Sequence, residues 1–195
     1  RREVVDHVLF YGQAGLGKTT LALLIASEMG GEVKVTSGPA LERAGDLASV
    51  LSTLESGNVL FIDEVHRMPT VVEEMLYSAM ESRKLHVVTG KGLGSRMLTF
   101  DLPPFTLIAA TTRLHMLTSP LRSRFGAIFK LDYYSVEDIE EILLRSAQII
   151  GVEVEREAIS RLAKAARFTP RIANRLLKRA RDVAEVQANG NITLG

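Results

Sequence analysis

The residues best suited to chemistry begin at Gly12. Segment 12–19 reads Gly-Gln-Ala-Gly-Leu-Gly-Lys-Thr and fits the phosphate-loop pattern G-x-x-x-x-G-K-[S/T]. Glycines let such a loop wrap so that its N–H groups converge on phosphate oxygens, and the following helix adds its positive dipole end. Lys18 would then meet the β- and γ-phosphates of a nucleotide, and the Thr19 hydroxyl would bind magnesium. A glycine-rich turn with a chance lysine is the alternative, but the flanking strand and helix patterns favour the phosphate loop.

Two adjacent carboxylates, Asp63 and Glu64, follow the apolar run 59–62. A buried parallel strand would place both acids at its carboxyl end, where ligands bind in open α/β sheets. We expect Asp63 to hold magnesium and Glu64 to orient and activate the attacking water as general base. A buried strand with an exposed acidic end is common in isolation, and the preceding phosphate loop makes the catalytic interpretation the better one.

Two further groups are ambiguous from residue type alone. The apolar run 105–110 ends in Thr111 and Thr112, where a hydroxyl could hydrogen-bond the water or the terminal phosphate, although threonines at strand ends are ordinary. Arg122 and Arg124 precede the last strand-like run. A permanently charged guanidinium suits transition-state charge on a neighbour's phosphate, but a solvated basic helix end is the commoner meaning of such residues.

A basic face is predicted on the last helical segment, because Arg171, Arg175 and Arg179 are spaced by four. Such faces are usually solvated. Arg171 differs because it lies in the first turn, where a lid could bring it over a nucleotide. The histidines, His66 among them, lack metal-ligand spacing, and we expect structural or surface positions for them.

These candidates need an α/β frame to position them. Strand-like and helical patterns alternate, which predicts crossovers and a parallel sheet. The expected strands are 7–11, 33–36, 59–62, 105–110 and 127–131, and the expected helices between them include 18–29, 45–54 and 71–81. Segments 85–89 and 97–102, joined by a glycine-rich loop, predict an inserted β-hairpin. Three helical patterns follow, at 135–150, 156–167 and 170–187, the last with Thr169 as N-cap and Pro170 in its first turn.

Composition bounds the class of protein. Of 195 residues, 46% are hydrophobic and 24% charged, which is enough for a core and ordinary for a globular chain. The net charge of +1 neither demands nor excludes a polyanionic partner, and the lack of cysteine excludes disulfides and thiolate metal sites. No apolar run approaches the roughly 20 residues of a membrane-spanning helix, and a signal-peptide core is missing. We therefore expect a cytoplasmic protein, and the absence of an initiator Met suggests a fragment of a longer one.

In this order the motifs resemble an AAA+ ATPase module, with a phosphate loop, an Asp-Glu pair, a polar sensor, an arginine finger and a helical lid. More narrowly, the chain resembles the RuvB family of Holliday-junction branch-migration ATPases. The resemblance runs through nearly the whole chain and rests on the strings DHVL, VTSGPA, LFIDEVHR, FTLIAATTR and TPRIANRLL, at residues 6–9, 35–40, 60–67, 105–113 and 169–177.

The resemblance implies a fold and a set of site residues. The fold would be a P-loop AAA+ parallel five-stranded sheet with helices on both faces and an inserted hairpin at about 85–102, all within residues 1–133. A small all-helical lid at 134–190 would follow, and 191–195 would begin the linker to an absent C-terminal winged-helix domain. Thr112 takes the sensor 1 place, Arg124 the arginine-finger place and Arg171 the sensor 2 place. With ATP or ADP and Mg²⁺ as ligands, the catalytic residues would be Glu64, Lys18, Arg124 and Thr112, and Thr19 and Asp63 would hold the metal. The nucleotide contacts would come from Gly12, Gly15, Leu16, Gly17, Lys18, Thr19, Thr20, Asp63 and Arg171.

The resemblance also implies partners. It implies an ATP-dependent DNA motor that drives branch migration in recombination and repair and works as a hexameric ring. The hairpin would dock onto a RuvA-type junction-binding protein through apolar residues that we expect to contact the partner rather than the core: Leu85, Val87, Val88, Met97, Leu98 and Phe100. Holliday-junction or duplex DNA would be held mainly by the absent C-terminal domain.

Two departures and two alternatives remain. Gln13-Ala14 stands where this family usually has two prolines, and Phe168 stands where a glycine is more usual. A clamp-loader-type switch uses the same parts, but it usually has a Ser-Arg-Cys finger and often a cysteine zinc insert. Here the finger reads Ser123-Arg124-Phe125 and cysteine is absent, which favours branch migration. A truncated partner-binding module with weak ATPase activity is the non-enzymatic alternative.

Overall fold

The computed structural model describes residues 5–89, 96–187 and 191–193. The chain divides into two compact units. The sheet unit comprises residues 1–12 and 18–130, and the lid unit comprises residues 13–17 and 131–195. Five residues of the phosphate loop therefore group with the helices of the lid unit.

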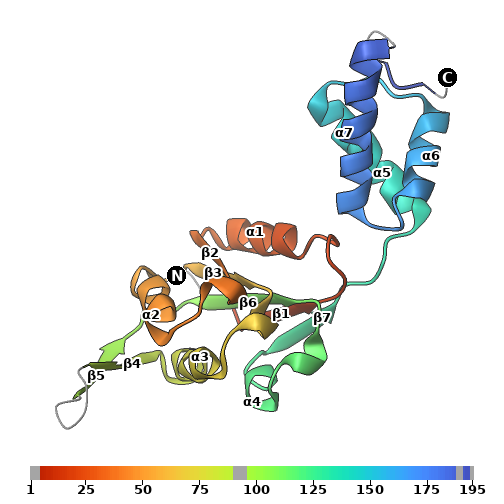
Figure 1. Cartoon of the computed structure of the whole chain (residues 1–195). Helices are drawn as coiled ribbons and strands as arrows, with labels where there is room; N and C mark the ends of the chain where they lie inside the picture. Colours follow the sequence, from red (N-terminus) through yellow and green to blue (C-terminus); the bar gives the residue numbers. More distant parts are fainter. Residues whose placement is uncertain (1–4, 90–95, 188–190, 194–195) are drawn as a thin grey trace. The chain divides into compact units, whose positions relative to one another are not determined.

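A parallel sheet forms the centre of the sheet unit. Within the described residues it has five strands in the order β2-β3-β6-β1-β7 (Figure 1). Their bounds are β1 Val8–Tyr11, β2 Val33–Ser37, β3 Val59–Asp63, β6 Thr106–Thr111 and β7 Ala127–Lys130. β3 and β6 are near-continuous apolar runs because a central parallel strand is buried on both faces. The predicted five-stranded parallel sheet is confirmed.

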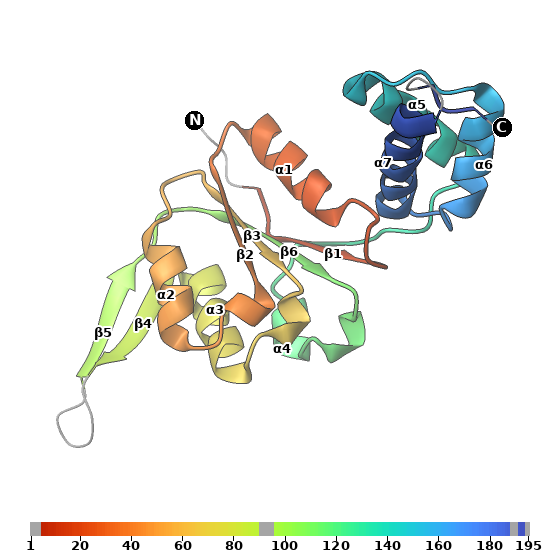
Figure 2. The ribbon, with the colours of Figure 1, turned by 45° about the horizontal axis from the view of Figure 1, so that its top comes forward.

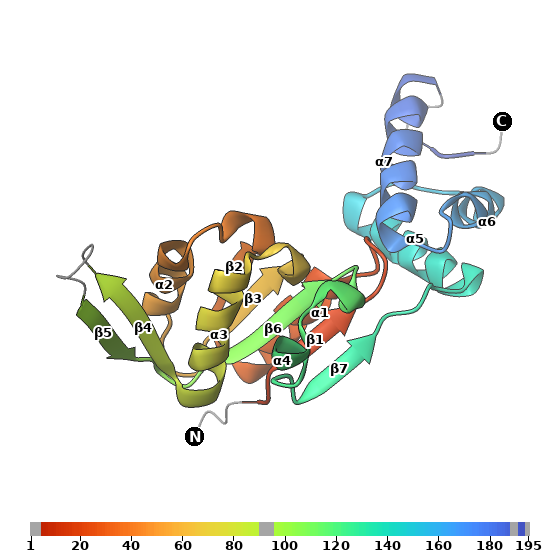
Figure 3. The ribbon, with the colours of Figure 1, turned by 60° about the horizontal axis from the view of Figure 1, so that its bottom comes forward.

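Helices cover both faces of this sheet. They are α1 Lys18–Met29, α2 Ala44–Ser52, α3 Thr70–Ser82 and the short α4 Ser119–Arg122. Figure 2 and Figure 3 show α1 on one face and the other three on the opposite face. Leu60 and Ile62 pack into the core cluster with α2 and α3, so the alternating Val59 and Phe61 point to the α1 face. Both faces of β3 are thus fully covered.

The predicted hairpin is present as β4 Lys84–Thr89 and β5 Arg96–Asp101, paired antiparallel. Its loop, 90–95, and the side chain of Val88 lie outside the described residues. Leu85 is 3% exposed and belongs to the core cluster, and Val87 packs against that cluster. The expectation that Leu85 contacts a partner is therefore wrong, because this end of the hairpin lies on α2 and α3. Among the hairpin side chains that the structure describes, the exposed apolar ones are those of Met97, Leu98 and Phe100.

The lid unit contains three helices among its described residues: α5 Val136–Ile150, α6 Arg156–Ala165 and α7 Pro170–Gln187. Ser135 begins α5 in a capping box with Asp138, which satisfies two N–H groups. Apolar side chains from all three helices form a separate core, with Ile139, Leu143, Ile159 and Leu177 at its centre. None of the helices in the described parts of the chain is long and apolar enough to cross a membrane.

The connection between α6 and α7 differs from the prediction in two respects. Helix α6 ends at Ala165 rather than Arg167, because Arg167 and Phe168 both take left-handed backbone angles, with φ of 50° and 57°. Thr169 takes the predicted N-cap position before Pro170, and its hydroxyl donates to the Arg167 carbonyl (3.0 Å), a bond that was not predicted. The Thr169 carbonyl accepts the N–H groups of Ile172 and Ala173 and so begins the helical ladder.

Candidate nucleotide site

The phosphate loop leaves the end of β1 and leads into the first turn of α1. The Gly12 N–H donates to the Thr111 carbonyl of the adjacent strand β6 (3.2 Å), which fixes the start of the loop. Lys18 is 7% exposed, and its Nζ donates to the Gly12 carbonyl (2.9 Å). The ammonium group therefore lies beside the α1 N-terminus, where its charge and the helix dipole both favour an anion.

The Asp-Glu pair stands at the end of β3. Asp63 is the last strand residue, and its Oδ1 accepts the Glu64 N–H (2.9 Å). Glu64 takes a left-handed conformation, with φ 48° and ψ 43°, and begins the 3-10 turn η2 Val65–Arg67. A non-glycine residue in this region is uncommon, and such residues cluster at functional sites. The Glu64 carboxylate pairs with Arg67 (3.1 Å) and is 44% exposed, so it remains open to water.

Strand order brings these motifs to one edge of the sheet. β6 lies between β3 and β1, and all three run parallel. Their carboxyl ends therefore bear the Asp63–Glu64 pair, the Thr111–Thr112 pair and Gly12 side by side. The chain leaves β1 for the distant strand β2, so β1 and β6 flank the point where the winding direction reverses, and open α/β sheets bind ligands at such a point.

The two threonines at the end of β6 differ in their contacts. Thr111 is fully buried, and its hydroxyl lies 2.9 Å from His66 Nδ1 and accepts the Arg113 N–H (2.9 Å). Thr112 is half-buried at the strand end. Burial lowers the pKa of His66, so the ring is neutral at pH 7 and can accept the Thr111 hydroxyl proton. Thr111 is thus engaged in holding the strand end together, and Thr112 remains the candidate sensor.

Arg124 lies at the amino ends of the parallel strands, opposite the carboxyl ends that bear the other motifs. Two residues separate it from β7, and the second of them, Gly126, donates its N–H to the carbonyl of His7, just before β1 (3.0 Å). The Arg124 guanidinium pairs with Glu81 of α3 (Nη2 to Oε1, 2.6 Å) and lies 5.5 Å from the centre of the Tyr77 ring. The candidate finger is therefore held against α3 of its own chain.

Within the lid unit, α7 lies against the phosphate-loop residues that belong to this unit. The Arg171 N–H donates to the Gly15 carbonyl (3.4 Å), and the Tyr134 hydroxyl donates to the Leu16 carbonyl (3.2 Å). Gly15 has φ +87°, and a Cβ there would lie 2.8 Å from Arg171 Cβ and from Thr169 Cγ2. Glycine is therefore required at this position for both backbone angle and space. The Arg171 side chain itself is exposed.

Comparison with known proteins decides the family. The model for the P-loop domain of the Holliday junction DNA helicase RuvB matches residues 1–131, and the model for the RuvB AAA lid domain matches residues 134–195. The chain belongs to the RuvB family. Among solved structures, it is similar to the RuvB Holliday junction branch migration motor of Thermotoga maritima, with 50% identity and a TM-score of 0.86 over 98% of this chain. A proline-to-glycine variant of the same protein matches with 49% identity and a TM-score of 0.89, also over 98% of this chain.

This RuvB-family chain spans about 60% of the length of those relatives, because the two matches cover 59% and 60% of their chains. The P-loop ATPase fold, with its AAA+ sheet and helical lid, is shared over almost the whole of the present chain. A P-loop domain of this family is a nucleotide-binding domain.

The donor set suits magnesium rather than a transition metal. Thr19 and Asp63 offer hard oxygen ligands, and the described residues contain no cluster of three or more His, Cys, Asp or Glu side chains that could enclose a metal. Mg²⁺ in phosphoryl-transfer sites usually takes one or two protein ligands together with water and phosphate oxygens. Two oxygen donors beside a phosphate loop therefore fit this ion.

The predicted site residues separate into three groups. Lys18, Thr19, Asp63, Glu64 and Thr112 come together with Gly12 at one edge of the sheet, where Thr20 is an exposed neighbour on α1. Gly15, Leu16 and Gly17 group with Arg171 in the lid unit. Arg124 is separate from the other predicted site residues and lies at the amino ends of the strands.

Sequence reasoning missed Glu73. His66 was expected to be structural or on the surface, and its contact with Thr111 beside the candidate sensor agrees with a structural role. Glu73 is 7% exposed on α3 and was not singled out at all. Its spacing of four from Tyr77, and of eight from Glu81, was the available signal.

Proposed function

We propose that this chain is the motor core of a ring-forming ATPase that drives branch migration of Holliday junctions. The placement of Arg124 carries the proposal. Lys18 and Glu64 lie at the carboxyl ends of the strands, whereas Arg124 lies beside His7 at the amino end of β1. Strand β1 has four residues, which span roughly 13 Å at about 3.3 Å per residue. An arginine this far from its own phosphate loop serves a nucleotide bound by a neighbouring subunit.

Each residue then has a defined task. Lys18 and the loop N–H groups bind the phosphates of ATP, and Glu64 orients the attacking water and accepts its proton. Thr112 contacts the water or the terminal phosphate, and Arg171 contacts the nucleotide from the lid. Arg124 of the next subunit stabilises the charge that develops on the phosphoryl group in the transition state.

Thr19 and Asp63 are the residues that would hold Mg²⁺. When bound, this ion neutralises charge on the β- and γ-phosphate oxygens. The Asp63 carboxylate is oriented for this task by the Glu64 N–H, which fixes Oδ1 at 2.9 Å. A change at Asp63 therefore disturbs the neighbouring base as well as the metal.

Solved variants of the Thermotoga RuvB support three of these assignments. They include a Lys-to-Arg, a Thr-to-Val and an Arg-to-Ala substitution. The three substituted positions are separated along that chain by the same numbers of residues as Lys18, Thr112 and Arg124 are here. The spacing supports equivalent positions for the phosphate-binding lysine, the sensor and the finger.

The assembly and partners follow from the same proposal. For these shared sites we propose a closed ring of six subunits, in the cytoplasm. The exposed Met97, Leu98 and Phe100 of the hairpin would contact a RuvA-type junction-binding protein. Junction DNA would be held mainly by a C-terminal winged-helix domain, so the power stroke would be generated in one domain and applied by another.

Mixing two inactive variants tests the shared site. Glu64→Gln lacks the base and Arg124→Ala lacks the finger, so each alone should hydrolyse ATP at least about 100-fold more slowly than the parent. Mixed rings contain interfaces with an intact base from one subunit and an intact finger from the other, and steady-state ATP hydrolysis should be partly restored. A mixture no more active than its components would contradict the shared site. A parent chain that binds Mg-ATP but does not hydrolyse it at any protein concentration would contradict the motor.

A further inference from the structure

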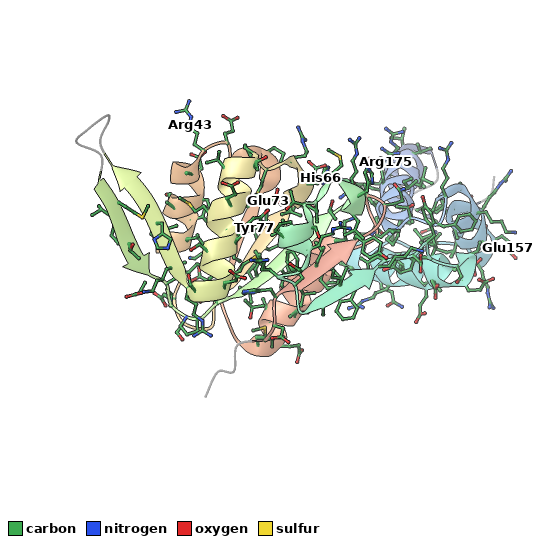
Figure 4. All side chains as sticks on the ribbon, turned by 90° about the horizontal axis from the view of Figure 1, so that it is seen from below. Arg43, His66, Glu73, Tyr77, Glu157 and Arg175 are labelled. Atoms are coloured by element: carbon green, nitrogen blue, oxygen red, sulfur yellow. The ribbon has the colours of Figure 1, made fainter. Side chains whose placement is uncertain are left out.

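Helix α3 presents a polar stripe to its neighbours. Glu73, Tyr77 and Glu81 are spaced by four and therefore lie on one face of the helix. Figure 4 shows Glu73 and Tyr77 close together on this helix. Glu73 is 7% exposed, and a glutamate is seldom buried so deeply unless it is paired. None of the tasks assigned above to the nucleotide site uses it.

The buried carboxylate ties α3 to the start of α4. Glu73 Oε1 accepts the Tyr77 hydroxyl (2.8 Å) and also the hydroxyl of Thr118. Burial raises the pKa of Tyr77, so the phenol keeps its proton and can donate. Thr118 is the N-cap of α4, and its hydroxyl oxygen accepts the Leu121 N–H (3.4 Å). One carboxylate oxygen thus orients both the Tyr77 ring and the N-cap residue of α4.

The same stripe carries the candidate finger. The Arg124 guanidinium lies over the Tyr77 ring, 5.5 Å from its centre, and pairs with Glu81 at 2.6 Å. Arg124 Nη1 also donates to the Pro120 carbonyl within α4 (3.1 Å). Glu81 is 57% exposed, and an ion pair so open to water contributes little. The restraint on Arg124 therefore depends on the ring and on α4. Glu73 bonds to both, and the Tyr77 and Thr118 hydroxyls also lie 2.6 Å from each other.

We propose that Glu73 is a positioning residue for Arg124, holding the Tyr77 ring and the start of α4 so that the guanidinium is presented at the subunit's edge. This inference rests on the proposed function, in which Arg124 serves the neighbour's nucleotide. Glu73 acts through Tyr77 and Thr118 and touches no reacting atom. A change at Glu73 should therefore affect the neighbouring subunit's nucleotide site, to which Arg124 is donated. Helix α3 also follows the Asp63–Glu64 pair closely in the sequence, so an effect on the chain's own site is the alternative to be tested.

Three variants isolate the carboxylate. Glu73→Met keeps the length of the side chain and removes the acceptor, whereas Glu73→Gln keeps an acceptor oxygen. Glu74→Met makes the same change at the adjacent, exposed position of α3 and serves as the matched control. Because an arginine finger contributes on the order of 10³–10⁵ in kcat, its misplacement by Glu73→Met should lower kcat about 10- to 100-fold, with KM changed by less than about threefold. Glu73→Gln and Glu74→Met should remain within about threefold of the parent.

Mixed rings then identify the site that is affected. Glu73→Met mixed with Glu64→Gln should regain activity, as Arg124→Ala does, because its own base is intact and its partner supplies the finger. Glu73→Met mixed with Arg124→Ala should not regain activity, because both lack a working finger. Restoration by Arg124→Ala and not by Glu64→Gln would place the defect at the chain's own base and overturn the proposal. Failure of both mixtures, with Arg124→Ala and Glu64→Gln still restoring each other, would mean a purely structural role and would also overturn it.

A second variant keeps the test decisive if Glu73→Met no longer binds a fluorescent ATP analogue. Thr118→Val removes the threonine hydroxyl that donates to Glu73 without changing the size of the side chain, and Thr118→Ser keeps that hydroxyl. Thr118→Val should reproduce the loss of kcat and the same complementation by Glu64→Gln, and Thr118→Ser should recover the parent rate. Parent-like kcat in Thr118→Val would overturn the proposal. If Arg124→Ala and Glu64→Gln fail to restore each other, it is the shared-site function itself that fails.

Discussion

A single methyl group at Gly38 should disable Glu64 without touching its side chain. Gly38 begins the 3-10 turn η1 Gly38–Ala40 directly after β2, and it is buried. A Cβ at this position would lie 2.3 Å from the Glu64 carbonyl oxygen and 3.2 Å from the Met68 nitrogen. Both are backbone atoms, so no side-chain rotation can relieve the clash. Gly38→Ala must therefore move the backbone on which the candidate base stands.

The size of the effect follows from the distances. Non-bonded heavy atoms are best separated by about 3.5 Å, so the Glu64 backbone or η1 must shift by about 1 Å. A misplacement of about 1 Å at a catalytic group costs on the order of 100-fold in rate. Overpacking of a closely packed contact costs about 1–3 kcal/mol of stability. We therefore expect Gly38→Ala to lower kcat about 100-fold and to reduce the free energy of unfolding by about 1–3 kcal/mol.

Gly45→Ala is the matched control. Gly45 lies in the first turn of α2, and no described atom outside its two chain neighbours and the adjacent backbone of α2 would come within 4 Å of its Cβ. Alanine there should keep the parent rate and add up to about 1 kcal/mol of stability, because it lowers the entropy of the unfolded chain. ATP hydrolysis at saturating ATP and urea unfolding measure the two quantities. A Gly38→Ala protein with parent kcat would refute the view that this contact sets the position of the base.

Substitutions at three further positions can be tested by urea unfolding. Burial lowers the pKa of His7, whose Nδ1 accepts the Leu107 N–H (2.9 Å). The folded chain therefore binds fewer protons than the unfolded chain near pH 6.5. Its free energy of unfolding should fall as the pH is lowered through about 6.5, by at most about 1.4 kcal/mol per pH unit. His7→Asn keeps an acceptor and does not titrate, so it should lessen the change between about pH 7.5 and 5.5, and an unaltered slope would refute the assignment. Thr111→Val leaves the Arg113 N–H without its acceptor and should cost about 1–3 kcal/mol, and Thr111→Ser should recover it. Phe168→Gly should be about 1 kcal/mol more stable than Phe168→Ala, the reverse of the usual order, because φ there is 57°.

The sheet and helices could be predicted because their signals are local. The central strands β3 and β6 are uninterrupted apolar runs, as burial on both faces requires, and α1 was predicted with its observed bounds because Gly30 and Gly31 stop it. The Gly30 N–H bonds to Ser27 and the Gly31 N–H bonds to Ala26, which closes the last turn. The end of α6 was not predicted because arginine and phenylalanine, at positions 167 and 168, rarely take left-handed backbone angles. The resemblance marked Phe168 as a usual glycine position, and the backbone explains why glycine suits it.

Contacts between distant segments could not be predicted in the same way. Glu73 and Thr118 are 45 residues apart, as are His66 and Thr111, and nothing in the sequence around each residue indicates its partner. Leu85 could not be placed from the sequence for another reason, because an apolar side chain is compatible with both a docking surface and a core. The fold decides between such alternatives, since α2 and α3 cover Leu85 on β4 and leave its cross-strand partner Phe100 on β5 exposed.

The strings on which the resemblance to this family rests lie partly outside the nucleotide motifs, and the packing gives a physical reason for their importance. Gly38, from the string 35–40, is in direct contact with the backbone of Glu64. Thr169 and Arg171, from the string 169–177, leave no room for a side chain at Gly15, and the Arg171 N–H donates to the Gly15 carbonyl. Each string therefore shapes the backbone of a motif that it does not belong to. A substitution in either string should change kcat through the position of the motif, and a compensating change should be found in the motif rather than in the string.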